Sequence, residues 1–126
     1  ARIRALQDLD LTVVDPSQED IPQQLAECFG IPQADKVLIA VGMRAVAEQA
    51  LGWTAPGGIV LLFGGLPKEE HLTIDPFAVH YEEVSIVGSF GYRLDHFQTA
   101  ISWLSKHSAE VALLVTHTVP FEQIEA

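Results

Sequence analysis

The chain has 126 residues, of which 48% are apolar and 19% charged, and its formal net charge is -10 at pH 7. This length and composition suit one globular domain with its own core and argue against an intrinsically disordered chain. The acidic balance argues against a nucleic-acid partner, and the apolar runs fall short of the roughly 20 residues that span a bilayer.

The first thirty residues are expected to form a helix, a strand and a second helix. Apolar residues recur at helical spacing over residues 1–10, and Leu11–Val14 is typical of a short strand. The second helix is predicted from Asp20 to Phe29, with Ser17 as its N-cap and Gly30 as its end. Three of its side chains are expected to face inward: Ile21, Leu25 and Phe29.

The centre of the chain predicts a strand, a helix and a second strand. The strands Lys36–Gly42 and Ile59–Gly65 are rich in Val, Ile and Leu and do not alternate with polar residues. Such runs indicate parallel strands that are buried on both faces. Helix-forming residues fill the interval Arg44–Leu51, and Pro56–Gly58 is expected to end this helix and turn the chain into the second strand.

Shorter elements follow this central unit. Leu72–Pro76 alternates and meets a proline, which predicts an edge strand, and Phe77–Tyr81 is expected to form a short helix. Val84–Gly91 is a third strand of the buried type, and Leu94–His107 has the strongest helical pattern. Residues 111–121 are expected to be extended, with a helix beginning in the last five residues. The long helix carries an apolar stripe of Phe97, Ile101 and Leu104.

Strands that alternate with helices predict the α/β class, here a partial Rossmann fold in a single domain over residues 1–126. In this doubly wound architecture a mainly parallel sheet carries helices on both faces. Its ligand lies beyond the carboxyl ends of the strands. Three strand ends are therefore of interest: Val41–Gly42, Gly64–Leu66 and Ser89–Gly91.

Four segments of the chain resemble one family. They are Ala34–Gly42, Pro56–Pro67, Val87–Gly91 and Val115–Phe121. Their order and spacing are similar to the zinc-dependent medium-chain dehydrogenases, and in particular to the sorbitol and threonine dehydrogenase branch. The resemblance implies the later part of a Rossmann coenzyme domain, with Leu11–Val14 as its third strand. The family's first strand, its G-x-G-x-x-G turn and its second strand, with the ribose-binding acid, are then expected before residue 1. Its zinc-bearing catalytic domain is also expected to lie outside these residues.

The resemblance also implies a cofactor, NAD or NADP, whose carboxamide is held by backbone groups at the strand ends. The cofactor-binding residues it implies are Val41, Gly42, Gly64, Gly65, Leu66, Ser89 and Phe90. No catalytic residue and no metal ligand is expected in these residues, because zinc belongs to the catalytic domain. The implied whole protein is an alcohol or polyol dehydrogenase, and the chain alone is expected to be inactive. The single cysteine, Cys28, favours a cytoplasmic location, because it offers no internal disulfide.

Two strand edges carry further expectations. The resemblance implies that Leu72–Pro76 pairs with its own copy in a homodimer or higher oligomer. In the strand order 3-2-1-4-5-6, the outer edge of Lys36–Val41 is bare when strands 1 and 2 are missing. Leu11–Val14 is expected to move beside this edge, or a second chain to pair with it.

The histidines, the cysteine and the paired acids of the chain are better explained as ordinary structural or surface residues than as members of a metal or catalytic site. The five histidines show no metal-ligand spacing, and Cys28 is expected to be an inert, partly buried thiol. The acid pairs Glu69–Glu70 and Glu82–Glu83 are expected to be solvated charges. Two other functions stay open: a non-enzymatic interaction module on a half-Rossmann scaffold, and an unrelated phosphoacceptor or flavodoxin-like domain.

Overall fold

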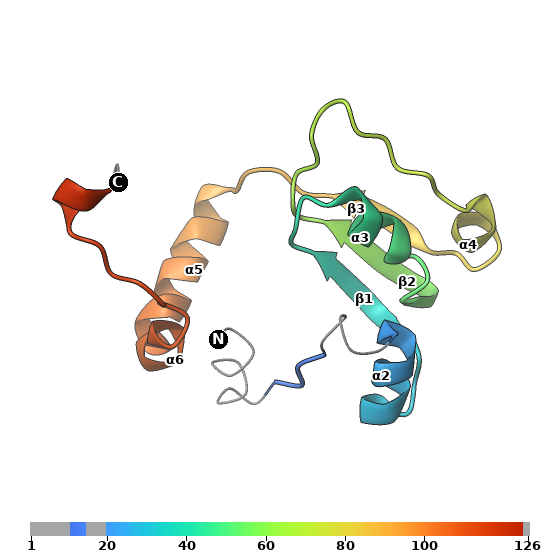
Figure 1. The fold of residues 1–126 in the computed structure, drawn as a ribbon, viewed down its shortest axis with the longest axis horizontal. Helices are drawn as coiled ribbons and strands as arrows, with labels where there is room; N and C mark the ends of the chain where they lie inside the picture. The colour runs from blue at the N-terminus through green and yellow to red at the C-terminus, as the bar shows by residue number, and fades with distance from the viewer. Residues whose placement is uncertain (1–10, 15–19, 125–126) are drawn as a thin grey trace. The chain divides into compact units, whose positions relative to one another are not determined.

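The computed structural model describes residues 11–14 and 20–124, which belong to two compact units. The larger unit is Val14–Gly91, and the other combines Ala1–Val13 with Tyr92–Ala126. The larger unit contains α2 (Ile21–Phe29), β1 (Ala34–Ile39), α3 (Arg44–Gln49), β2 (Thr54–Leu62), α4 (Pro76–His80) and β3 (Ser85–Gly88) (Figure 1). The other contains α5 (Leu94–Lys106), α6 (Ser108–Ala112) and the 3-10 helix η1 (Phe121–Gln123). The helix expected over residues 1–10 and the cap at Ser17 lie outside the described residues.

The sheet of the larger unit has three parallel strands in the order β1-β2-β3. In its register Leu38 lies opposite Leu61, which in turn lies opposite Val87. Consecutive parallel strands that are neighbours, with α3 between the first two, form the expected βαβ unit. The α/β class and the predicted order of the three buried-type strands are confirmed.

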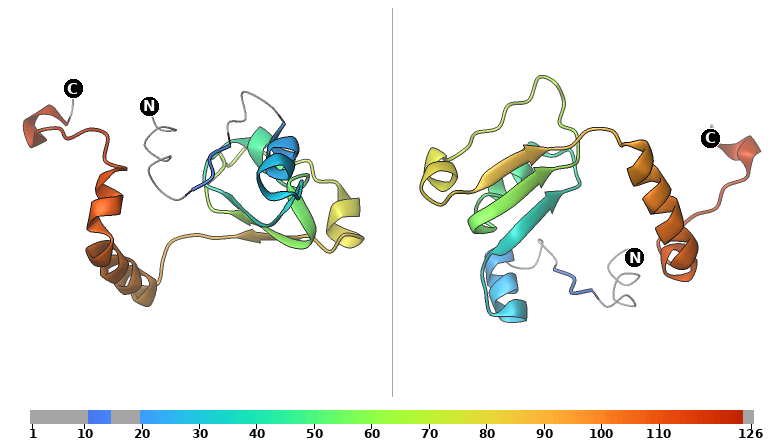
Figure 2. Two further views of the ribbon diagram at one scale, coloured as in Figure 1. Left: turned by 90° about the horizontal axis from the view of Figure 1, so that it is seen from below. Right: turned by 180° about the vertical axis from the view of Figure 1, so that it is seen from behind.

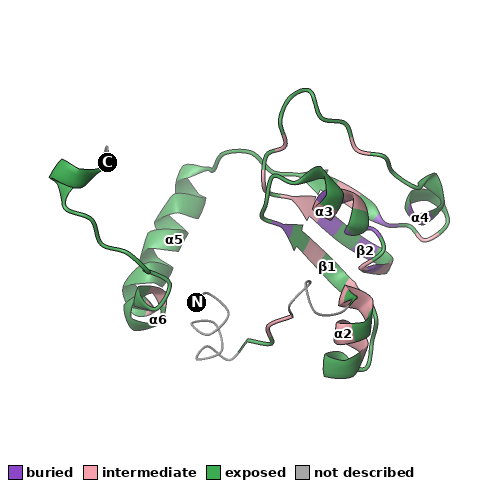
Figure 3. Ribbon diagram, viewed as in Figure 1, coloured by how far each residue is buried: buried purple, intermediate pink, exposed green. Residues whose placement is uncertain are grey.

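One face of the sheet carries the core of this unit. The core cluster consists of Ile39, Ala47, Ala50, Leu51, Val60 and Val84. Figure 3 shows its buried positions on the sheet and on α3, and the view from behind in Figure 2 shows the strands in front of that helix. On the opposite face Leu38, Ile59 and Val87 remain 59%, 40% and 44% exposed. Within this unit, helix packing buries one face of the sheet only. Burial of the second face stays a prediction.

The Pro56–Gly58 segment is part of β2 and does not form the expected turn. The chain turns earlier, where the fully buried Thr54 donates its hydroxyl to the Ala50 carbonyl at 2.7 Å. The register then passes from Ala34 opposite Thr54 to Lys36 opposite Ile59, so that β2 carries extra residues in a bulge. A bulge tolerates proline, which has no N–H for the ladder. The φ of 78° at Gly57 also belongs to it.

The expected edge strand Leu72–Pro76 is wrong, since residues 71–75 have no regular secondary structure. Asp75 instead caps α4, its Oδ1 accepting the Phe77 N–H at 2.9 Å, and Pro76 begins the helix. The alternation in this segment favours a strand, whereas the Asp75–Pro76 pair favours the start of a helix. Asp supplies the N-cap, and the fixed φ of proline suits the first helical position.

Leu11–Val14 forms no strand, and the sheet described here ends at β1. A four-residue strand needs a hydrogen-bonded neighbour, and none pairs with it in the part of the chain that the structure describes. The expected move of this segment beside β1 stays a prediction, because most of the segment belongs to the other unit. Pairing of the β1 edge with a second chain stays a prediction.

Helix α2 follows the prediction closely. It ends at Gly30, whose φ is 73° and whose N–H donates to the Ala26 carbonyl at 2.8 Å. This left-handed cap suits glycine because it has no Cβ. Two side chains differ from expectation: Phe29 is 55% exposed and Cys28 is exposed rather than partly buried. No residue of α2 is fully buried, so its last turn remains open to solvent.

In the second unit, the long helix is confirmed to within one residue as α5. Its apolar stripe is only half-buried, with Phe97, Ile101 and Leu104 between 43% and 49% exposed. The extended segment expected from residue 111 begins later, because α6 covers Ser108–Ala112. Glu110 in its first turn, 3.0 Å from Nδ1 of His107, supports this helix start. Among the described helices, none has the length and hydropathy needed to cross a membrane.

Candidate functional site

The carboxyl ends of β1, β2 and β3 meet at one edge of the sheet, because the strands are parallel. Hydrogen bonds tie the segments that follow them. The Ile39 carbonyl accepts from Phe63 at 3.1 Å and from Gly64 at 2.7 Å, and Ser89 donates to the Leu62 carbonyl at 3.2 Å. The seven predicted cofactor-binding residues all follow directly from these ends. The fold thus brings together residues that are far apart in sequence.

Two glycines allow the first two strand ends to approach each other. A Cβ on Gly42 would overlap the Gly65 carbonyl oxygen, and one on Gly64 would lie 2.7 Å from the Val41 carbonyl carbon. Neither position can hold a side chain without moving backbone. Gly65 is different, since nothing lies within 4 Å of the place its Cβ would take. The edge is therefore tightly packed between the two turns and open on the side where Gly65 lies.

This edge presents unpaired backbone donors. Gly64 and Ser89 have already donated their N–H groups to the sheet. For the N–H groups of the other predicted residues, the described part of the chain shows no hydrogen bond; these are Val41, Gly42, Gly65, Leu66 and Phe90. Such groups can bind a ligand that offers acceptor oxygens, such as a carboxamide. The role of these residues in cofactor binding stays a prediction.

The described residues offer no metal centre. No group of three or more His, Cys, Asp or Glu side chains among them could hold an ion. Four histidines are exposed, as expected for surface residues, and the His107 side chain is 37% exposed beside Glu110. The residues of this part of the chain therefore do not fit zinc.

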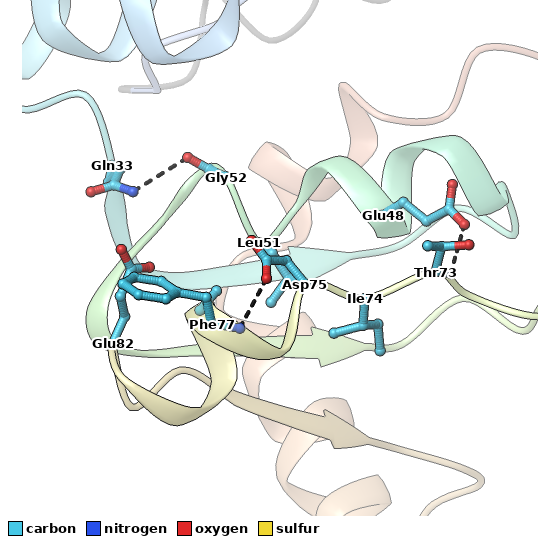
Figure 4. A pocket seen from close by; sticks show the side chains of 10 residues that line it. Gln33, Glu48, Leu51, Gly52, Thr73, Ile74, Asp75, Phe77 and Glu82 are labelled. Atoms are coloured by element: carbon cyan, nitrogen blue, oxygen red, sulfur yellow. Dashed lines mark hydrogen bonds between the residues drawn. The ribbon is translucent and has the colours of Figure 1, made fainter.

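A pocket of about 570 Å³ lies at the opposite end of the strands (Figure 4). Gln33, Gly52 and Glu82, which precede β1, β2 and β3, are among its lining residues. None of the predicted cofactor-binding residues lines it. Two carboxylates line this pocket, and each accepts a hydrogen bond from a backbone N–H group. Glu48 accepts from Thr73, and Asp75 accepts from Phe77 and so caps α4.

Glu48 is the residue that sequence reasoning missed. In the sequence it is one helix former among several, and its only local signal is the i,i+4 spacing from Arg44. That pair is loose, with Nε and Oε1 3.8 Å apart and the arginine half exposed. The stronger contact is to the backbone 25 residues away, 2.8 Å long, which no local pattern reveals.

Comparison with known proteins decides the family. The model of the family described as "Zinc-binding dehydrogenase" matches residues 1–106. The chain belongs to the zinc-binding dehydrogenase family. The resemblance to zinc-dependent dehydrogenases is thereby confirmed, and the phosphoacceptor or flavodoxin-like alternative is wrong.

Three relatives illustrate this zinc-binding dehydrogenase membership. L-galactonate-5-dehydrogenase of Escherichia coli (strain K12) is 31% identical over 113 residues, which cover 90% of this chain and 33% of that protein. D-altritol 5-dehydrogenase of Agrobacterium fabrum is 27% identical, covering 98% of this chain and 35% of the relative. The structure of Haloferax mediterranei glucose dehydrogenase in complex with NADP, Zn and gluconolactone is 25% identical, with a TM-score of 0.76 over 98% of this chain and 35% of that chain. The chain thus spans about a third of the length of these relatives.

Proposed function

We propose that this chain forms the nicotinamide side of the NAD(P) site in a zinc-dependent alcohol or polyol dehydrogenase. The observation that carries the proposal is the edge where three parallel strands end with unpaired backbone N–H groups beside the open Gly65. Family membership supports it, as do the names of relatives that act on sugar-derived alcohols and acids. The Haloferax mediterranei structure holds NADP and zinc.

In this proposal the chain positions the coenzyme and performs no bond-breaking step itself. Backbone N–H groups of Gly65, Leu66 and Phe90 hold the carboxamide oxygen and so fix the face of the ring that meets the substrate. The bound coenzyme would supply or accept the hydride. Zinc would be held by residues outside the described ones. We propose a cytoplasmic location and no turnover by these 126 residues alone.

Titration with NADH, followed by nicotinamide fluorescence, tests the proposed site. We expect weak saturable binding with a Kd of about 1 mM, near -4 kcal/mol, because the nicotinamide half alone contributes contacts. Reduced nicotinamide mononucleotide should compete with NADH, whereas AMP should not.

Two variants sharpen this titration. Gly65→Val places a side chain in the open space at the edge and should abolish binding without unfolding the chain. Gln33→Ala, at the opposite end of the strands, is the matched control and should bind as the parent does. Competition by AMP alone would contradict the proposal, as would no saturation of the parent by ~10 mM NADH. The second result would favour a non-enzymatic module.

We also propose that the segment Leu72–Pro76 joins two copies of the chain. Ile74 is 37% exposed in this irregular segment, which leaves it accessible to a partner. Sedimentation equilibrium should show a dimer for the parent chain and a monomer for the Thr73→Lys, Ile74→Pro double variant, because proline removes a donor and lysine adds charge. An unchanged dimer in the variant would contradict this contact.

A further inference from the structure

The peptide group between Gly65 and Leu66 has a fixed direction at the proposed coenzyme edge. A Cβ on Gly42 would overlap the Gly65 carbonyl oxygen and would lie 3.4 Å from the carbonyl carbon. Since a C=O bond is about 1.2 Å long, the oxygen lies between that Cβ position and the carbon. The Gly65 carbonyl therefore points at Gly42.

The direction of this carbonyl sets the direction of the Leu66 N–H. None of the described peptide bonds is cis, and in a planar trans peptide the C=O and N–H bonds point in opposite directions. The Leu66 N–H therefore points away from Gly42 and from the turn that follows β1. Since β2 lies between β1 and β3, this donor is directed to the side on which Phe90 follows β3.

Two further constraints hold Leu66 in this orientation. Its side chain packs against the core cluster, which anchors the residue to the sheet. Pro67 follows it, and a proline confines the preceding residue to extended backbone angles. Within the described part of the chain, the N–H groups of Leu66 and Phe90 donate no hydrogen bond. Leu66 thus presents a backbone donor that is already oriented before a ligand binds.

We infer that Gly42 is a positioning residue, whose missing side chain makes room for the Gly65 carbonyl and so aims the Leu66 N–H at the bound coenzyme. This inference rests on the nicotinamide site proposed above. A carbonyl oxygen has two lone pairs, so the carboxamide oxygen can accept from Leu66 and Phe90 together. With a side chain at position 42, the carbonyl must rotate away, and the rigid peptide group turns the N–H with it.

Replacing the carboxamide oxygen of the coenzyme with sulfur tests this role. Thio-NADH carries a thiocarboxamide, whose sulfur is a weaker acceptor than oxygen. In NMR titrations we expect the parent chain to bind NADH about tenfold more tightly than thio-NADH, which is the effect of one good hydrogen bond. Gly42→Ala should weaken the binding of NADH about fivefold and leave that of thio-NADH unchanged, so that the preference falls to about twofold.

Gly58→Ala is the matched control for lost stability. A Cβ at Gly58 would lie 2.6 Å from Cγ2 of Thr54 and 2.9 Å from the Asp35 carbonyl oxygen, so this variant is strained as well. Gly58 lies within β2, before the strand reaches the coenzyme edge. Gly58→Ala should therefore keep the preference of the parent chain for NADH. Circular dichroism shows whether each variant is folded.

The outcomes separate the role of Gly42 from the site on which it depends. Equal weakening of both coenzymes by Gly42→Ala would indicate a general structural effect and overturn the inference, while the site stands. Loss of the preference in Gly58→Ala, or equal affinity of the parent chain for both coenzymes, would overturn it as well. No saturation of the parent chain by NADH would overturn the proposed site and the inference together.

The parent chain provides a second measurement if Gly42→Ala does not fold. In the inferred orientation the Leu66 amide proton lies on the far side of its peptide group from Gly42. No strong NOE should therefore join this proton to the Hα protons of Gly42, and its signal should shift more with NADH than with thio-NADH. A strong NOE between these protons, or equal shifts with the two coenzymes, would overturn the inference.

Discussion

Gly42→Ala is expected to destabilise the domain by about 3 kcal/mol, and Gly65→Ala to leave its stability unchanged or raise it by roughly 0.5 kcal/mol. The two glycines lie in adjacent turns, and their contacts differ. The Cβ added at Gly42 would overlap the Gly65 carbonyl oxygen, whereas the one added at Gly65 meets nothing within 4 Å. Neither glycine has a positive φ, so the effect of Gly42→Ala is steric and not conformational.

Urea unfolding of the two variants measures this difference. Gly64→Ala should behave like Gly42→Ala, because its Cβ would lie 2.7 Å from the Val41 backbone. A loss of about 3 kcal/mol corresponds to a fall in Tm of about 15 °C for a domain of this size. Equal stability of Gly42→Ala and Gly65→Ala would mean that the turns after β1 and β2 are not in contact in solution. The proposed coenzyme edge would then lose its geometry.

The elements predicted correctly from the sequence are those with strong local signals. The αL glycine at the end of α2 and the alternation of helix formers with Val-, Ile- and Leu-rich runs both act within a few residues. The position of the candidate site follows from the same information. Once three strands are known to be parallel, their carboxyl ends must share an edge, so Gly42, Gly65 and Phe90 could be grouped from the sequence.

The failures occur where two local signals compete or where a distant contact decides. Leu72–Pro76 alternates like a strand, but Asp75 and Pro76 also start a helix, and the helix forms. The Pro56–Gly58 segment has turn residues, yet the buried Thr54 turns the chain earlier. The bond from Thr73 to Glu48 joins residues 25 apart, and the sequence has no periodicity at that spacing.

The two faces of β1 should respond differently to the loss of a large side chain. Ile39→Ala is expected to cost about 3 kcal/mol, because Ile39 is 4% exposed and its loss leaves a cavity beside the core. Leu38→Ala should cost less than about 1 kcal/mol, because Leu38 points to the opposite face, is 59% exposed and leaves no cavity. Both substitutions remove an aliphatic side chain from the same strand. The β-branched Ile39 also has the higher β propensity, but this difference lies within the ~1 kcal/mol span of that scale and is smaller than the expected gap.

Chemical denaturation of these two variants at several protein concentrations also shows whether the second face is covered in solution. A small, concentration-independent effect of Leu38→Ala confirms that this face is open in the chain. A cost close to that of Ile39→Ala would contradict the prediction and show that another layer buries Leu38. Dependence of that cost on protein concentration then assigns the layer to a second copy, since only association responds to concentration. A concentration-independent cost assigns it to the same chain.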